Sequence, residues 1–181
     1  NYLFATDVSG NPIWATQPSH HLYNASVQSF CSSNGGDILI FSAEEKYGET
    51  YLTIAEVSSG SGTLNNYWEY RLHIGTDIHQ SSFITTATRV PDHGYFLTLS
   101  SSTNEAYTIS LDFGLNIIEI NRQEFILNGN PRPLDIHEVL LTDDAQLYFV
   151  ETLQNGLASN PNGAIVGKLN FGHDVLNLKY I

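Results

Sequence analysis

The sequence has few basic residues, a single cysteine, no methionine and no long apolar run. Seven Lys and Arg residues stand against 19 Asp and Glu residues, which gives a formal net charge of -12. Nucleic-acid binding draws on phosphate neutralisation by Lys and Arg, so we expect no nucleic-acid partner. The same excess of negative charge argues against an anionic membrane surface.

The single cysteine and the short apolar runs exclude two further kinds of structure. Cys31 has no second cysteine to pair with, so no disulfide can form within the chain. We expect a buried, inert thiol, because neither a His partner nor an electropositive setting is visible beside it. No run of about 18 apolar residues is present, so we expect no membrane insertion. The sequence opens inside an apolar run at Asn1, which we interpret as the start of a processed or excised piece.

Charged residues make up only 14% of the chain, so Ser, Thr, Asn and Gly must supply much of its polar surface. This balance is typical of extracellular, cell-surface or periplasmic proteins, which is where we expect this one. The 181 residues are enough for one domain with a real core, and we expect a single domain over residues 1–181.

The dominant local pattern is the period-2 alternation of β-strands. Tyr107, Ile109 and Leu111 alternate with the polar residues Thr108 and Ser110. Aromatic and β-branched residues fill such segments, as strands prefer, and no segment has the spacing of an amphipathic helix. The pattern therefore predicts an all-β protein with almost no helix.

One polar turn recurs along the chain. It is present at Asp7–Asn11, Asp112–Asn116 and Asn170–Asp174, and a longer version begins at Glu56. A repeat of about 40–58 residues that holds short strands and a polar turn is typical of blade repeats. The Asp or Asn that opens each turn can accept hydrogen bonds from the turn that follows it.

Each repeat is predicted to contain four strands, which we call A to D. Strands A and B are joined by turns with residues that tolerate positive φ, at Asn34–Gly36 and Asp92–Gly94. The recurring polar turn joins strands C and D. Residues 25–72, 81–125 and 138–181 each supply four strands, whereas residues 3–17 supply only C and D.

The turn with its following strand resembles the blades of Kelch/PQQ-like β-propellers. The best match is Asp7-Val-Ser-Gly-Asn-Pro-Ile-Trp14, and Trp68 is taken to occupy the place of Trp14 in the next unit. Glu119 and Asn177 stand at that place in the later units. The resemblance implies about three and a half four-stranded antiparallel blades, as part of a larger or multi-chain propeller. It implies a fold and no activity, since propellers host many functions.

A repeated polar feature lies just before strand A, where propeller loops open near the central axis. Convergence of these side chains from neighbouring blades would form a polar ligand rim or a metal site. The alternative is structural, with Asp capping the loop and His bonded to backbone. We predict a ligand-binding site and assign no metal, cofactor or catalytic residue. The predicted site residues are Asp77, His79, Asp135, His137, His21 and Tyr23.

The predicted function is a binding or scaffold module for a protein or polysaccharide. Exposed aromatics such as Tyr23, Trp68 and Tyr70 could stack on sugar rings or anchor a protein, although such residues also serve as packing core. The alternative is an enzyme, a hydrolase or lyase centred on His79 and His137. No G-x-S-x-G, P-loop or H-E-x-x-H motif is present, so binding is preferred over catalysis.

Two structural expectations complete the prediction. The strand at Leu3–Thr6 should keep an unpaired edge, which invites a companion chain, a missing part of the same precursor or self-association. Five aromatic residues should be buried between neighbouring blades. These residues are Trp14, Phe30, Phe83, Phe96 and Phe149.

Overall fold

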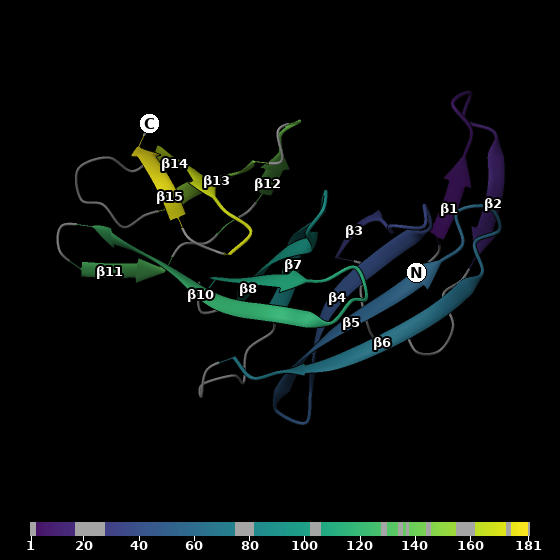
Figure 1. Cartoon of the computed structure of the whole chain (residues 1–181), viewed down its shortest axis with the longest axis horizontal. Coiled ribbons are helices and arrows are strands. Elements are labelled where there is room, and N and C mark those ends of the chain that lie inside the picture. Colours follow the sequence, from purple (N-terminus) through teal and green to yellow (C-terminus); the bar gives the residue numbers. More distant parts are fainter. Residues whose placement is uncertain are drawn as a thin grey trace. The chain divides into compact units, whose positions relative to one another are not determined.

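The structure is a computed structural model of the whole chain (Figure 1). It describes residues 3–16, 28–74, 82–101, 106–127, 130–133, 136, 138–143, 146–154, 162–172 and 175–180. Every regular element within these residues is a β-strand, as the alternation predicts. No helix among them is long and apolar enough to cross a membrane.

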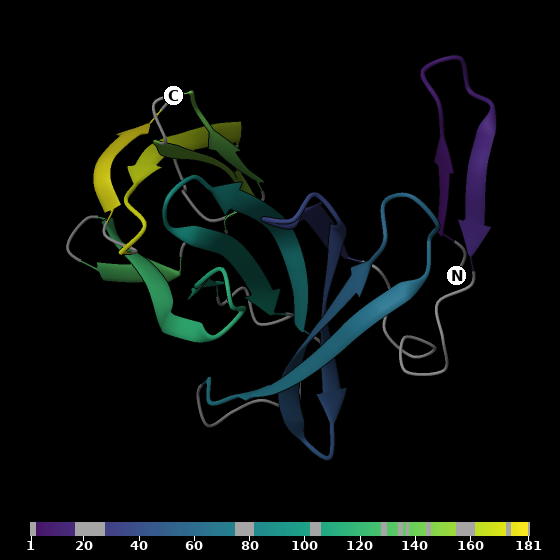
Figure 2. The same ribbon diagram turned by 45° about the vertical axis from the view of Figure 1, so that its right-hand side comes forward.

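The described chain divides into two compact units, Asn1–Ile84 and Thr85–Ile181. The single domain expected over residues 1–181 is not tested by this division and stays a prediction. The first unit holds a two-stranded sheet and a four-stranded sheet, and Figure 2 shows the two-stranded one as a separate purple hairpin. The strands of the first sheet are β1 (Leu3–Thr6) and β2 (Pro12–Thr16). Those of the second are, in spatial order, β3 (Ser29–Ser32), β4 (Ile38–Lys46), β5 (Glu49–Val57) and β6 (Leu64–Leu72).

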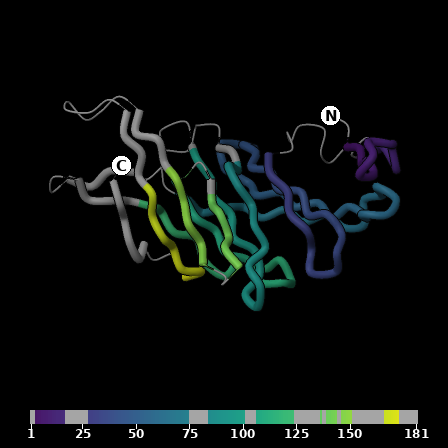
Figure 3. The backbone as a smooth tube through the Cα atoms, turned by 90° about the horizontal axis from the view of Figure 1, so that it is seen from above, coloured from purple at the N-terminus to yellow at the C-terminus, as the bar shows by residue number. Residues whose placement is uncertain are grey.

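The second unit holds a five-stranded and a four-stranded sheet, and neighbouring strands of each are consecutive in the sequence (Figure 3). The five-stranded sheet contains β7 (Ser82–Val90), within which the unit boundary falls, β8 (Gly94–Ser101), β9 (Ala106–Leu111), β10 (Ile117–Leu127) and β11 (Asn130–Pro133). The four-stranded sheet contains β12 (Glu138–Leu141), β13 (Leu147–Gln154), β14 (Asn162–Leu169) and β15 (Val175–Tyr180).

These sheets confirm the all-β prediction at the level of strands and hairpins. Three sheets contain the predicted succession from strand A to strand D, and β1 with β2 forms the isolated C–D pair. Strand β11, which extends the third sheet, was not predicted. The four-stranded sheets are consistent with blades, but the described residues form no closed barrel or propeller. The propeller therefore remains a proposal.

The core of the second unit lies between its two sheets. Val90 and Phe96 from β7 and β8 pack against Val139, Leu147 and Phe149 from β12 and β13. Phe96 and Phe149 are completely buried, which confirms two of the five aromatic predictions. The inward-facing residues of two stacked sheets thus interdigitate, as in other layered β-folds.

The remaining aromatic predictions have mixed outcomes. Phe30 is 68% exposed, so its predicted burial is wrong. It lies on β3, an end strand of its sheet, where it borders an open hollow rather than a packed layer. Trp14 is half-buried, and the side chain of Phe83 lies outside the described part of the chain. Cys31, also on β3, is half-buried rather than buried.

The polar turns confirm the predicted capping chemistry. The Asp7 carboxylate accepts hydrogen bonds from the Ser9 and Asn11 backbone amides and from the Asn11 side chain, at 2.8–2.9 Å. Asp112 accepts the corresponding bonds from Asn116 in the second unit. Gly36 and Asp92 have positive φ, as the turns between strands A and B predict.

The position predicted for Trp68 needs a correction of two residues. Each polar turn is followed by a register shift, and the first residue pair beyond it is Ala5 with Trp14 in the β1–β2 pair. The corresponding pair in the next sheet is Glu56 with Asn66. Asn66 therefore occupies the place of Trp14, because the longer Ser58–Thr63 turn shifts the strand. Trp68 lies two residues further along, on the same face of the sheet.

Candidate binding surface

The six residues of the predicted ligand site lie outside the described residues. Asp77, His79, Asp135, His137, His21 and Tyr23 therefore have no structural outcome, and that site remains a sequence prediction. Among the residues that the structure does describe, no three His, Cys, Asp or Glu side chains gather in a way that could hold a metal ion. The candidate surface that the structure shows lies instead on strands β4, β5 and β6.

The tip of the β4–β5 hairpin presents a fully exposed aromatic ring. Lys46 pairs with Glu49, so only Tyr47 and Gly48 form the turn. Their φ angles are 56° and 76°, which fits a type I′ turn, where both central residues need positive φ. Asn and Gly favour this conformation, whereas a bulky residue there costs about 1 kcal/mol. Tyr47 nevertheless occupies it, with a side chain that is 98% exposed.

A polar network covers one face of the sheet beside this tip. The Nζ atom of Lys46 lies 3.0 Å from Glu44 Oε2 and 2.5 Å from Glu69 Oε2. The Tyr67 hydroxyl donates a hydrogen bond of 3.2 Å to the same Glu69 oxygen. Lys46 Nζ also lies 5.8 Å from the centre of the Tyr51 ring, within the range of a cation–π contact. Three strands thus contribute to one connected array.

The charges of this array hold one another in place. Burial lowers the pKa of Lys46, but hydrogen bonds to Glu69 and Glu44 outweigh that effect and raise the pKa above its usual value. Burial also raises the pKa of Tyr67, against the opposing charge of Lys46, so its hydroxyl remains a donor at neutral pH. The Glu44 side chain is only 8% exposed, which leaves Lys46 as the charge that balances it. A further ion pair joins Arg71 to Glu49.

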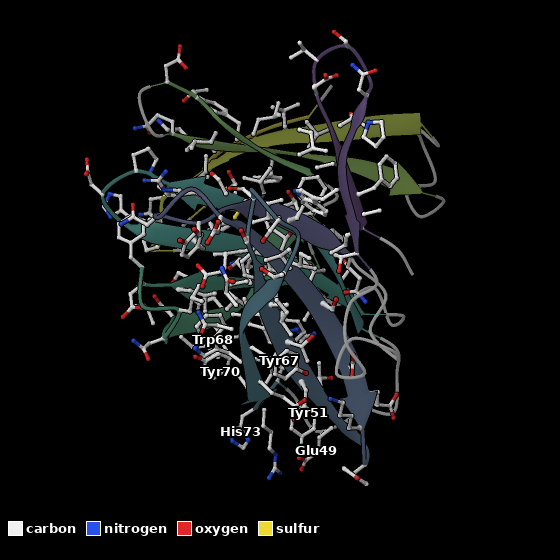
Figure 4. The ribbon with its side chains drawn as sticks, turned by 90° about the vertical axis from the view of Figure 1, so that its right-hand side faces the viewer. Glu49, Tyr51, Tyr67, Trp68, Tyr70 and His73 are labelled. Atoms are coloured by element: carbon white, nitrogen blue, oxygen red, sulfur yellow. The ribbon has the colours of Figure 1, made fainter. Side chains whose placement is uncertain are left out.

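The two aromatic residues singled out on β6 lie on the opposite face. Trp68 pairs with Ile54 and Tyr70 with Leu52, and both of these partners are completely buried. Paired residues share a face, so Trp68 and Tyr70 lie over a buried part of the sheet. Figure 4 shows Trp68 and Tyr70 directed to one side of the hairpin, with Tyr67 and Tyr51 on the other. Both are half-buried, and their part in binding remains a prediction.

We call this array, together with Tyr47 at the tip, the hairpin surface, and its Tyr67 end packs against the buried residues Ile40, Ala55 and Val57 on the same face. It consists of Tyr47, Tyr51, Tyr67, Glu44, Lys46 and Glu69. No sequence motif reveals it, because its members are spread over three strands. One local signal was available, since Lys46-Tyr47-Gly48-Glu49 places a Gly and two opposite charges around a tyrosine, as a tight hairpin would.

A second feature of the first unit is an open apolar hollow. The β1–β2 pair contributes Leu3, Phe4 and Trp14, and the four-stranded sheet contributes Phe30, Ile38, Ile40 and Val57. Leu3 and Trp14 pack against the buried residues Ile40 and Val57. Phe4 and Phe30 also line the hollow and remain 72% and 68% exposed.

Comparison with known proteins defines the chain at the level of its fold. No family model matches the sequence, and a search of curated proteins finds no match. Among solved structures, a protein of unknown function from Bacteroides caccae is similar, with a TM-score of 0.55 and 13% sequence identity. The similarity covers 96% of this chain and 52% of that one, so this chain spans about half the length of its structural relative. A likeness at this identity supports a shared fold and carries no function.

Proposed function

We propose that this chain is a carbohydrate-binding module and that its hairpin surface binds a neutral polysaccharide. The single observation that carries the proposal is Tyr47, a fully exposed ring at a backbone position that disfavours it. A strained backbone conformation persists where other interactions of the protein offset its cost, and strained residues cluster at functional sites. A ring that contributes no burial to the fold is available to a ligand.

The chemistry of the surface suits a sugar. Sugar rings present C–H faces that stack on aromatic side chains, and hydroxyl groups that bind carboxylates and amines. Tyr47, Tyr51 and Tyr67 offer aromatic surface, and Glu69 offers a half-exposed carboxylate beside them. The ion pairs with Lys46 order these groups before binding, which reduces the entropy lost on association.

The charge of the chain favours a neutral polymer over an acidic one. The formal net charge is -12, so a polyanionic chain would be repelled. Lys46 is already bonded to two carboxylates, and Arg71 to Glu49, so these cations are engaged within the protein. A polysaccharide partner agrees with the extracellular, cell-surface or periplasmic location that the composition indicates.

Affinity electrophoresis tests the proposal with soluble xyloglucan, galactomannan and dextran as neutral polymers and polygalacturonate as the acidic comparison. We expect at least one neutral polymer to retard the wild-type chain. Tyr47→Asn should weaken that retardation about tenfold, because it removes the ring while keeping a residue that the turn favours. Thermal unfolding should show Tyr47→Asn to be at least as stable as wild type.

Tyr148 in the second unit provides the matched control. It lies on β13, is 37% exposed and has Lys168 Nζ at 5.9 Å from its ring centre, so it too is a surface tyrosine beside a lysine. Tyr148→Asn should leave retardation unchanged. Equal weakening by both variants, binding to polygalacturonate alone, or no retardation by any neutral polymer would each reject the proposal.

A further inference from the structure

The aromatic and charged residues of the hairpin surface alternate along the direction of its strands. On β6, Tyr67, Glu69 and Arg71 are spaced two residues apart, so they lie on one face of the strand. Tyr51 on β5 pairs with Arg71 and therefore lies on that face as well. Figure 4 shows Tyr51 and Tyr67 on this side of the hairpin. The position of Glu69 thus falls between two positions along the strands that each carry a tyrosine.

The two tyrosine positions are further apart than the width of one sugar ring. Tyr67 pairs with Ala55, which lies on β5 four residues beyond Tyr51. A strand rises about 3.3 Å per residue, so the two positions are about 13 Å apart along the strand axis. Tyr47 lies at the hairpin tip, before the start of β5. The three tyrosines therefore occur at intervals along the hairpin, and only a ligand of several linked sugars can contact all of them at once.

The Glu69 side chain, at the position between Tyr67 and Tyr51, is 37% exposed. Two donors hold one of its carboxylate oxygens, the Lys46 ammonium and the Tyr67 hydroxyl at 3.2 Å. A carboxylate in this position can accept hydrogen bonds from the hydroxyl groups of a sugar that lies between two sugars stacked on the rings. Aromatic and hydrogen-bonding positions thus repeat along the hairpin, which suits a polymer that repeats a ring and its hydroxyl groups.

The strands that carry these residues are long and continuous. β4, β5 and β6 contain nine residues each, and β4 stays paired with β5 from Ile38 to Lys46 without a shift of register. Paired strands, and not a loop, therefore fix the spacing of Tyr51 and Tyr67. A ligand that is already extended loses little conformational freedom when it binds along such strands, whereas a coiled polymer must first straighten.

We propose that the ligand of the hairpin surface is an extended glucan or mannan backbone that lies along the strands and contacts Tyr47, Tyr51 and Tyr67 through separate sugars. This inference rests on the proposed function, since it names the class of polysaccharide and the direction in which it binds. Sugars joined through equatorial bonds at both ends, as in cellulose and mannan, form a straight chain. The axial bond of a starch-type chain makes it coil, so the same sugars then cannot follow the hairpin.

Isothermal titration calorimetry with cello- and manno-oligosaccharides, from the disaccharide to the hexasaccharide, tests the inference. We expect the affinity for at least one series to rise about tenfold or more from the shortest member to the longest, because only long members contact several tyrosines. Malto-oligosaccharides of the same lengths contain the same glucose units as the cello-oligosaccharides but coil. We expect the malto-hexasaccharide to bind about tenfold or more weakly than the better of the two extended hexasaccharides.

Two variants at opposite ends of the hairpin surface separate a long ligand from a short one. Tyr47→Asn removes the ring at the tip, and Tyr67→Leu removes the other ring while keeping an apolar side chain against the buried residues beneath it. Each variant should weaken hexasaccharide binding about tenfold. At most one of them should affect the disaccharide, which cannot reach both ends. Tyr148→Asn in the second unit is the control and should leave every affinity unchanged.

The inference fails while the proposed function stands if a neutral polymer retards the chain but the disaccharide binds as tightly as the hexasaccharide. It also fails if the malto-oligosaccharides bind as tightly as the extended ones, since the surface then does not select a straight chain. If no neutral polymer and no oligosaccharide binds, the proposed function fails as well. Should circular dichroism show that Tyr67→Leu does not fold, the length series with the wild-type chain decides.

Discussion

The indole nitrogen of Trp14 donates a hydrogen bond of 2.8 Å to the backbone carbonyl of Ser59. This bond joins β2 to the turn between β5 and β6. The flat side of the indole also lies against Gly62 in the same turn, where an added Cβ atom would be 2.5 Å from the ring. Glycine is required at position 62 for two reasons, the contact with Trp14 and its φ of +70°.

We therefore expect Gly62→Ala to destabilise the first unit and displace Trp14. The backbone conformation alone costs about 1–2 kcal/mol for a residue with a Cβ, and the clash with the indole adds to it. Gly36→Ala is the control, because Gly36 has φ +89° but nothing within 4 Å of the added atom. Urea unfolding followed by tryptophan fluorescence compares the two. Equal losses of unfolding free energy for Gly62→Ala and Gly36→Ala would mean that the indole moves aside without cost.

Asp37 caps the Ser58–Thr63 turn, which lacks an opening Asp like those of the Asp7 and Asp112 turns. The Asp37 carboxylate accepts hydrogen bonds from the Ser59 backbone amide and the Asn65 side chain, each at 3.0 Å. Asp37 lies between strands A and B and thus caps a turn that is distant in sequence, whereas Asp7 caps the turn that it opens. The sequence pattern identified this segment only as a longer version of the polar turn, because the capping residue is distant in sequence.

Distance along the sequence likewise separates the features that the sequence could predict from those that it could not. Strand positions and the capping by Asp7 and Asp112 depend on neighbours within a few residues, and the structure confirms them. The exposure of Phe30 depends on whether another layer covers β3, which no local pattern records. The network around Lys46 depends on the register of three strands and was missed for the same reason.

Gly94 begins β8 at a position where even one added methyl group has no room. An ideal Cβ there would lie 2.0 Å from the Leu111 carbonyl oxygen and 3.0 Å from Asp112 Cα, and φ is +139°. Backbone atoms of a paired strand cannot yield as a flexible side chain can, and Tyr95 beside Gly94 pairs with Leu111. We expect Gly94→Ala to cost about 3 kcal/mol or to prevent folding. Gly35→Ala, whose nearest contact is Ser33 Oγ at 3.7 Å, should change thermal unfolding little.

Phe96 and Phe30 should respond oppositely to truncation. Phe96 is completely buried in the core of the second unit, so Phe96→Ala should cost about 3–5 kcal/mol in denaturant unfolding. Phe30 is 68% exposed, so Phe30→Ala should stay within about 0.5 kcal/mol. A large loss for Phe30→Ala would show that another layer covers β3.

The capping carboxylates predict a dependence of stability on pH. The Asn116 side chain, through its hydrogen bond, lowers the pKa of Asp112 below its ordinary value of 3.8, against a smaller effect of burial. A carboxyl group with a lower pKa in the folded state stabilises the fold above its unfolded pKa. That contribution is present above about pH 4 and is lost as the pH falls through the lower, folded value.

Asp112→Ala should therefore cost about 0.5 kcal/mol at pH 6 and less as the pH falls below 4, because protonation removes the same contribution from the wild-type chain. Urea unfolding between pH 6 and pH 3 measures the difference. Asn116→Ala removes the hydrogen-bond donor, so it should have the same pH dependence, and the double variant should cost less than the sum of the two. Asp143→Ala removes an exposed carboxylate from another turn of the second unit and serves as the control. A cost of Asp112→Ala that stayed constant down to pH 3 would show that the turn depends on the shape of the side chain and not on its charge.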